Sequence, residues 1–192
     1  MDFKLSILVP WHETKHKSKF SMLIKSLDCQ LAPVEESVEI LDLPNRGQKS
    51  IGHYRQTLLE NAKGEYVVFI DADDRISIEY IALVMNAINT GCDVVGLSGT
   101  MTTNGMKQET WEIGKDLPYD QLEVKKRIYH YRRYSNHLAP IKRSIALQIG
   151  FKDMKYGEDY DYATRLKESG LCKTETKIEN RIYHYDYWSI RK

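Results

Sequence analysis

The sequence predicts an α/β fold, in which a mixed, mainly parallel sheet is flanked by helices and carries a small antiparallel hairpin. Three observations support this prediction. Short apolar runs alternate with segments of helical periodicity, carboxylates directly follow several of these runs, and an Asn-Gly pair later interrupts the alternation. At 192 residues the chain is long enough for one domain with a complete core, and we expect its halves to be residues 1–97 and 98–192.

The first half contains four apolar runs that we expect to form parallel strands. The runs are Leu5–Val9, Val38–Leu41, Tyr66–Ile70 and Asp93–Leu97. Pro10 is expected to end the first strand. Helical periodicity separates the runs at residues 20–27, 51–62 and 81–88. Because ligands of doubly wound sheets bind beyond the carboxyl ends of the strands, three loops should converge on one crevice.

The second half departs from this alternation. Asn104-Gly105 lies between two strand-like segments and predicts a two-residue hairpin turn. Residues 120–134 are expected to form a helix. Two further helices are predicted at Ser144–Ile149 and Gly157–Gly170, and a last strand at Arg181–Tyr185.

An acidic cluster follows the third strand, in the sequence Asp71-Ala72-Asp73-Asp74. Carboxylates this close repel one another unless a cation or a cationic side chain compensates them. Oxygen ligands favour Mg²⁺ or Mn²⁺, so the cluster indicates a divalent metal. The alternative is an Asp-rich turn that caps a helix beginning near Ser77.

A second acidic group, Glu158-Asp159-Tyr160-Asp161, lies at the start of the helix predicted from Gly157. The helix dipole favours acids at this position whatever the function. The functional interpretation is that Glu158 or Asp159 acts as a general base toward the first acidic cluster, while Arg165 holds a neighbouring carboxylate.

Composition restricts the class of protein. The net charge is +1, and no stretch resembles a signal peptide or the roughly 20 apolar residues of a membrane span, so a soluble, cytoplasmic protein is expected. Cys29, Cys92 and Cys172 form no CxxC pair, which indicates buried thiols and neither a disulfide framework nor a zinc site.

The segment 124–134 is rich in basic and aromatic residues and contains no acid. It is interpreted either as a solvated helix face or as a site for a phosphate-bearing acceptor, a nucleic acid or an anionic membrane surface. Trp111 and Trp188 are candidates for stacking on a sugar, with ordinary packing as the alternative.

Several segments follow one another in a specific order. After Pro10 and Gly52–Gln56 come AKGEYVVFIDADD, IKRSIALQIGF, YGEDYDYATRL and IYHYDYW. Across nearly the whole chain this order resembles the family 2 glycosyltransferases, which have the GT-A fold. The resemblance implies a nucleotide-diphosphate sugar donor, bound by residues 1–97, and an acceptor and catalytic half at residues 98–192. It also implies Mn²⁺ or Mg²⁺, held at a DxD-like motif.

The resemblance implies roles for individual residues. Asp42 matches the position that recognises the nucleobase, Asp71 lies on the ribose side of the DxD-like motif, and Asp73 binds the metal. Asp159 matches the catalytic base, with Glu158 as its acceptor-side neighbour. The implied nucleotide-sugar-binding residues are Pro10, Trp11, His12, Glu13, Asp42, Arg55, Asp71 and Ala72.

One further role concerns the metal. His184 lies where some family members supply a histidine to the metal or the diphosphate, and His12 and His53 are alternatives. The chain departs from the family at Leu43–Gly47 and at Tyr54-Arg55-Gln56, which leaves the nucleobase and the sugar open.

The implied chemistry suits these residue types. A divalent metal neutralises the departing diphosphate, and one carboxylate takes the proton of the acceptor hydroxyl, which predicts inversion in a single displacement. The acceptor itself, a glycan, a lipid-linked sugar or a nucleic acid, stays open. The main alternative is a binding module for nucleic acid or an anionic ligand with a degenerate transferase site. A phosphatase-like hydrolase and a nucleotidyltransferase are weaker rivals.

Overall fold

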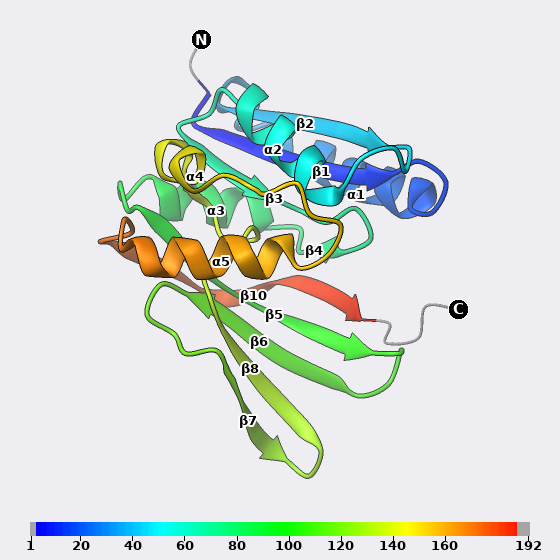
Figure 1. The fold of residues 1–192 in the computed structure, drawn as a ribbon, viewed down its shortest axis with the longest axis vertical. Helices are drawn as coiled ribbons and strands as arrows, with labels where there is room; N and C mark the ends of the chain where they lie inside the picture. The colour runs from blue at the N-terminus through cyan, green and yellow to red at the C-terminus, as the bar shows by residue number, and fades with distance from the viewer. Residues whose placement is uncertain (1–2, 188–192) are drawn as a thin grey trace.

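The computed structural model describes residues 3–187, in which one sheet carries helices on both faces (Figure 1). The strands are β1 (Leu5–His12), β2 (Val38–Asn45), β3 (Tyr66–Phe69), β4 (Arg75–Ile76), β5 (Val94–Thr103), β6 (Gln108–Gly114), β7 (Asp120–Lys125), β8 (Ile128–Tyr134), β9 (Ile141–Lys142) and β10 (Glu175–Tyr187). The helices are α1 (Lys17–Leu31), the 3₁₀ turn η1 (Glu35–Ser37), α2 (Ile51–Asn61), α3 (Tyr80–Ile88), α4 (Arg143–Ile149) and α5 (Glu158–Ser169).

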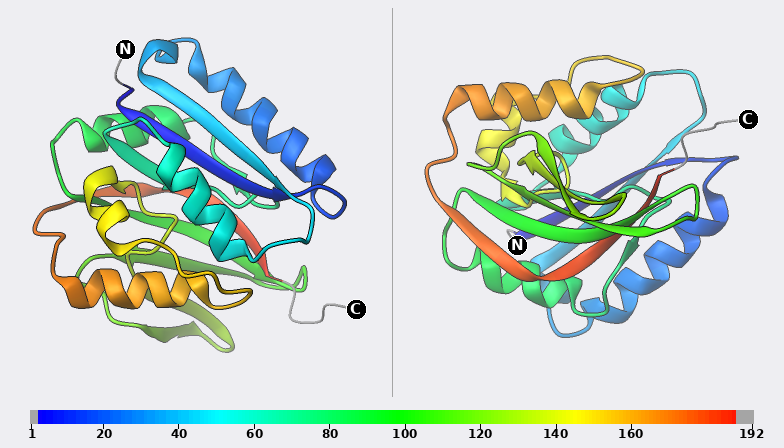
Figure 2. Two further views of the ribbon diagram at one scale, coloured as in Figure 1. Left: turned by 45° about the horizontal axis from the view of Figure 1, so that its top comes forward. Right: turned by 90° about the horizontal axis from the view of Figure 1, so that it is seen from below.

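The sheet is mixed, as predicted. Its main path runs β2-β1-β3-β9-β5-β6-β8-β7, and β10 pairs with β5 and β4. β2, β1 and β3 pair in parallel, and β10 pairs in parallel with β5, whereas β9 and β6 are antiparallel insertions. Helices α2, α4 and α5 cover one face and α1 and α3 the other, so the fold has three layers (Figure 2).

The core lies around the central strands. All four residues of β3 are buried, and so are the first six of β1. Strands covered by helices on both faces need continuous apolar sequence, and this requirement explains why these runs were recognisable from the sequence. The carboxyl ends of β1, β2 and β3 therefore emerge together from a rigid core.

Pro10 does not end the first strand, contrary to the prediction. It lies within β1 and is in register with Leu43 of β2. The pairing of β1 with β3 ends at Leu8, so beyond that residue β1 has a neighbour on one side alone. A proline, which lacks an N–H group, is tolerated on such a free edge.

The predicted hairpin is confirmed, but its connection is longer than the expected two residues, because β5 ends at Thr103 and β6 begins at Gln108. Asn104 and Gly105 both have positive φ, 52° and 67°, as a turn between two twisted antiparallel strands requires. The predicted helix between Gly157 and Gly170 is also confirmed, and both glycines adopt the left-handed conformation at its ends.

The helix predicted at residues 120–134 is wrong. The segment forms the antiparallel pair β7 and β8, whose turn includes Arg127 with a φ of 56°. Its Lys and Arg residues favour helices, but the Ile and Tyr residues of β8 favour strands and gain partners on β6. Strand alternation also divides the basic residues between two faces, and Asp120 pairs with Arg132, so no basic helix is available for a membrane or nucleic acid.

Two smaller expectations also change. Cys29 is exposed and Cys172 half-buried, contrary to the expectation of buried thiols, whereas Cys92 is buried. Trp111 is a packed residue of β6, because its ring is buried and meets the ring of Tyr183 at 5.8 Å. Trp188 lies outside the described residues.

The carboxylate of Asp93, just before β5, links three segments of the chain by hydrogen bonds. It accepts hydrogen bonds from Lys142 Nζ at 2.9 Å and from the backbone N–H groups of Lys173 and Thr174 at 2.8 and 2.9 Å. The Lys142 bond, assisted by these N–H groups and opposed by burial, lowers the pKa of Asp93. The carboxylate therefore stabilises the fold above the unfolded-state pKa of about 3.9, and this contribution is lost as the pH falls.

Replacing Asp93 with asparagine is expected to lower the free energy of unfolding at pH 7 by about 1–3 kcal/mol, because charged hydrogen bonds are lost. Urea unfolding of both proteins across pH 3–7 measures this difference, which should shrink below about pH 4. A difference that stayed constant with pH would contradict the assigned role.

Candidate active site

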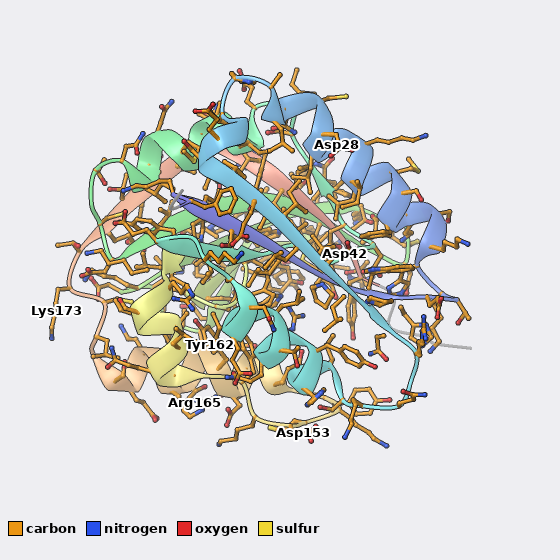
Figure 3. The ribbon with its side chains drawn as sticks, turned by 90° about the horizontal axis from the view of Figure 1, so that it is seen from above. Asp28, Asp42, Asp153, Tyr162, Arg165 and Lys173 are labelled. Atoms are coloured by element: carbon orange, nitrogen blue, oxygen red, sulfur yellow. The ribbon has the colours of Figure 1, made fainter. Side chains whose placement is uncertain are left out.

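The carboxyl ends of β1 and β2 bring Trp11 and Asp42 together. Trp11 Nε1 donates a hydrogen bond to Asp42 Oδ1 at 2.7 Å, and its ring stacks on Phe20 with centroids 4.3 Å apart. Asp42 itself is exposed on β2 (Figure 3). The result is a flat aromatic surface beside an accessible carboxylate, at the edge where the sequence predicted a crevice.

The acidic cluster follows β3 as a tight turn, in which Asp74 N donates to Asp71 O at 3.0 Å. It does not cap a helix, because β4 comes next and α3 begins only at Tyr80, with Glu79 as its N-cap. The structure therefore removes the capping alternative for these carboxylates.

Arg55, a buried residue of α2, compensates the charge of this cluster. Its guanidinium, 5% exposed, donates from Nη2 to Asp71 Oδ1 at 2.9 Å and from Nε to Glu158 Oε1 at 3.2 Å. His137 Nε2 lies 3.4 Å from the other Asp71 oxygen. One buried cation thus joins α2, the turn after β3 and the start of α5.

These contacts set the ionisation of the pair. Burial alone would favour the neutral forms, but Arg55 and then His137 outweigh it and hold the pKa of Asp71 well below its usual range. Burial likewise acts against the charge of Arg55, and Asp71, Glu158 and Asp159 together raise the pKa of Arg55. Asp71 is therefore a carboxylate that is already paired, and this pairing leaves Asp73 as the more available acid.

Tyr183 orders the other side of the turn. Its hydroxyl donates to Asp74 Oδ2 at 2.7 Å and accepts from Asp71 N at 3.2 Å. Burial and the Asp71 carboxylate raise the pKa of Asp74 well above its usual value. Burial, Asp74 and Asp71 also raise the pKa of Tyr183, so the phenol keeps its proton and remains the donor.

Replacing Tyr183 with phenylalanine is expected to cost about 1–3 kcal/mol of stability, because buried Asp74 loses its hydrogen-bond donor. The matched control is Tyr185→Phe on the same strand, which should change stability by less than about 0.5 kcal/mol. Chemical denaturation of the two variants measures both effects. Equal effects of the two replacements would show that the Tyr183 hydroxyl does not hold the turn.

Helix α5 carries the second acidic group. Glu158 is directed at Arg55 and its side chain is 7% exposed, whereas Asp159 is partly exposed. Asp159 lies at helical spacing from Ala163 and Leu166, both buried, and its Oδ1 accepts a hydrogen bond from Tyr160 N at 2.9 Å. The effect of Asp159 on the pKa of Arg55 places its charge near the acidic cluster.

The start of α5 is held in place from the neighbouring elements. Ser50, the N-cap of α2, donates to Asp153 in the connection that leads to α5 (Figure 3). Arg165 does hold a neighbouring carboxylate, that of Asp161, at 2.7 Å, and it also donates to the carbonyl of Gly150 at 2.7 Å. The bonds of Ser50 and of Gly150 connect α5 and the segment before it to α2 and to the end of α4.

A sequence model of the family described as Glycosyl transferase family 2 matches residues 31–150, more than half of the chain. The chain belongs to glycosyl transferase family 2. The matched residues include Asp42, Arg55 and the acidic cluster, whereas β1, Glu158 and Asp159 lie outside them. No curated protein matches the chain significantly.

Solved structures show that this family 2 chain has the GT-A fold. S. aureus TarS 1–349 in complex with UDP-GlcNAc superimposes with a TM-score of 0.67 at 18% identity, covering 99% of this chain and 59% of that one. The catalytic domain of Drosophila beta1,4galactosyltransferase 7 in complex with xylobiose gives 0.57 at 15% identity, covering 93% and 66%. The chain thus spans less than two thirds of either neighbour.

The remaining predicted residues of the family 2 site lie at or just beyond the carboxyl ends of β1 and β3. Glu13 pairs with Arg46 at 3.0 Å, and His12 Nδ1 lies 3.3 Å from Thr14 Oγ1. Asp73, with 36% of its side chain exposed, lies 3.7 Å from His16 Nε2, a neighbour that the sequence did not suggest. Ala72 is buried behind the turn.

His184 lies apart from this group. Its Nδ1 is 2.7 Å from Thr100 Oγ1 and its Nε2 is 3.0 Å from Asp186 Oδ1, whereas the adjacent Tyr183 reaches the acidic cluster. Successive strand residues point to opposite faces, so only one of the two can face the turn. His53, the other alternative, makes an edge contact with Tyr54.

No group of three His, Cys, Asp or Glu side chains gathers closely enough to hold a metal ion by itself among residues 3–187. Two buried nitrogens beside Asp71, Arg55 Nη1 and His137 Nδ1, have no hydrogen-bond partner within the same part of the chain. Native structures leave few buried polar atoms without a partner, and a bound water, ion or ligand can satisfy them. None of the helices in residues 3–187 combines the length and the apolar composition that a membrane span needs.

Proposed function

We propose that the protein transfers a sugar from a nucleotide-diphosphate sugar to an acceptor hydroxyl, with inversion and with a divalent metal. The observation that carries this proposal is the junction around Arg55, where the acidic turn after β3 meets the acidic start of α5. The acidic turn and the start of α5 lie in different environments, and they would have different tasks. The turn would bind the donor, and the start of α5 would remove the proton of the acceptor. The UDP-GlcNAc bound to the TarS neighbour supports a nucleotide sugar as the donor.

The donor would lie along the ends of β1 and β2. The Trp11 surface and the exposed Asp42 suit a nucleobase, because a ring stacks on one and hydrogen-bonds to the other. Asp71 would face the ribose while Arg55 and His137 keep it ionised. His12 and Glu13 would lie beside the donor, and the buried Pro10 would support them from within β1.

The residues fit a divalent metal at Asp73. Mg²⁺ in nucleotide sites is bound by one or two carboxylates together with substrate phosphates, so a cage of three protein ligands is not required. Asp73 is the most exposed acid of the turn, and among residues 3–187 its carboxylate has only His16 nearby, at 3.7 Å, whereas Asp71 and Asp74 accept shorter hydrogen bonds from Arg55 and Tyr183. Bound there, Mg²⁺ or Mn²⁺ would neutralise the charge that develops on the diphosphate.

The proton of the acceptor hydroxyl would pass to Asp159. Its partial exposure leaves the carboxylate accessible, and its charge acts on Arg55 beside the acidic turn. Glu158, buried against Arg55, would position this end of α5 rather than contact the acceptor. Attack from the side opposite the leaving diphosphate needs one base and no covalent intermediate, so the anomeric configuration inverts.

Thermal unfolding with UDP, GDP, ADP, CDP and dTDP, each with and without Mn²⁺, tests this function. A nucleotide present at 100 times its dissociation constant stabilises by about 2.7 kcal/mol, which corresponds to a shift of about 5–10 °C for a chain of this size. One nucleotide should give a shift that Mn²⁺ increases. The proposal fails if none of the five changes the unfolding temperature.

A further inference from the structure

Two exposed tyrosines meet beside the start of α5. Tyr119, before β7, is 49% exposed, and Tyr160, in α5, is 54% exposed. Their rings contact edge to face, with centroids 5.3 Å apart and an interplanar angle of 82°. Tyr134 of β8 joins them, 5.8 Å from Tyr119. We call these three residues the tyrosine cluster.

The cluster is held in a fixed arrangement. The Arg133 guanidinium lies 4.2 Å from the centre of the Tyr119 ring and 5.3 Å from that of Tyr131. The same guanidinium donates to the carbonyl oxygens of Asp120 and Arg132 at 2.5 and 2.8 Å. Because Arg133 is anchored by backbone, the Tyr119 ring is presented with little freedom, and ordered rings bind at low entropic cost.

Helix geometry places the cluster next to Asp159. Successive side chains on a helix are about 100° apart, so Glu158 and Tyr160 flank Asp159 on the surface of α5. Glu158 is directed at Arg55 on one side and Tyr160 at Tyr119 on the other. The tyrosine cluster therefore begins one residue from the carboxylate that the proposed function assigns as the base, on the side away from the acidic turn.

The chemistry of this surface suits a neutral carbohydrate. Aromatic rings with a polar edge stack on the apolar faces of sugars, and phenol and guanidinium groups bind hydroxyls. On the same side of β8, the buried carboxylate of Glu109 accepts a hydrogen bond from the Tyr131 hydroxyl at 3.2 Å.

Two cations contact the cluster, Arg133 and Lys167, whose Nζ lies 5.9 Å from the centre of the Tyr134 ring. Lys167 is 3.7 Å from the Asp116 carboxylate, and the nearby Arg132 is paired to Asp120. Among residues 3–187 this leaves Arg133 as the cation of the cluster without a carboxylate partner, too little positive charge to favour a polyanion.

We propose that the tyrosine cluster and Arg133 form the acceptor subsite and that the acceptor is a neutral carbohydrate. The sugar that receives the transferred residue would stack on Tyr160 and Tyr119, with its hydroxyl directed at Asp159. This inference rests on the proposed function and adds the acceptor class to it.

Saturation-transfer difference NMR on the full chain tests the inference. The probes are neutral tetrasaccharides of glucose, xylose, mannose, galactose and N-acetylglucosamine. At least one should receive saturation from the protein, and Tyr119→Ala with Tyr160→Ala should weaken its binding at least about tenfold. The matched control is Tyr156→Ala, because Tyr156 is 78% exposed and makes no ring contact within residues 3–187, so this variant should bind as the wild type does.

Three results would overturn the acceptor subsite: no tetrasaccharide binds, binding survives in the double variant, or a short RNA binds at the cluster in place of the sugars. Binding of the nucleoside diphosphates with Mn²⁺ is measured on the same samples. If that binding persists while every tetrasaccharide fails, the acceptor inference alone is wrong. If both fail, the proposed function is wrong as well.

Discussion

Replacing Arg55 with methionine is expected to lower the free energy of unfolding by about 3–5 kcal/mol, which corresponds to a decrease in Tm of roughly 6–20 °C. Arg55 is the buried cation between Asp71 and Glu158, so its removal leaves two carboxylates without compensation. Breaking one partner of a buried ion pair is costly for this reason, even where the intact pair contributes little. Urea unfolding at pH 7 measures the loss.

Two further variants separate charge from packing. Arg46→Met removes an exposed arginine that pairs with Glu13, and such surface pairs contribute no more than about 1 kcal/mol. Adding Glu158→Gln to Arg55→Met removes one of the orphaned charges and should restore part of the stability. If Arg55→Met were no more harmful than Arg46→Met, Arg55 would not be the compensating charge of the site.

Replacing Asp159 with asparagine is expected to lower the turnover rate by a factor of about 10²–10⁴ and to leave the binding of the donor nucleotide unchanged. The amide keeps the shape of the side chain but does not accept a proton. The rate is measured as release of nucleoside diphosphate from nucleotide sugars that carry the base identified by the nucleotide panel.

Asp161→Asn is the matched control for this prediction. Asp161 lies in the same first turn of α5 but pairs with Lys152 and Arg165, away from the acidic turn. This variant should keep its activity and lose only a little stability. An Asp159→Asn protein as active as Asp161→Asn would contradict the assignment of the base.

The acidic turn was predictable from the sequence because its cause is local. A strand buried on both faces needs continuous apolar residues, and Asp71 to Asp74 end that run abruptly. The position of Asp159 was predictable for a similar reason, since Gly157 and the acids that follow it mark the start of a helix.

The segment from Asp120 to Tyr134 was not predictable in this way. Its composition suits a helix, and its strand conformation depends on pairing with β6, which lies distant in the sequence. Local periodicity does not contain that information. The correction matters for function, because the strands place Arg133 against Tyr119, whereas a helix would have presented a basic surface.

The partners of the acidic turn were the hardest to predict. His137 precedes a strand of two residues and had no recognisable pattern around it. Tyr183 lies in the segment IYHYDYW, where we singled out His184, and strand alternation turns the two side chains to opposite faces. A shift of one residue in strand register moves a side chain to the opposite face of the sheet, and composition does not reveal the register.

Calorimetric titration of wild-type protein and Asp73→Asn with the nucleoside diphosphate selected by the panel, with and without Mn²⁺, tests the central claim most directly. That claim is that the turn after β3 binds a nucleotide diphosphate through a divalent metal at Asp73. Mn²⁺ should tighten binding to the wild type at least about tenfold, or 1.4 kcal/mol, and should have little effect on the variant. Equal affinities with and without Mn²⁺ in the wild type, or a metal effect that survives in Asp73→Asn, would contradict it.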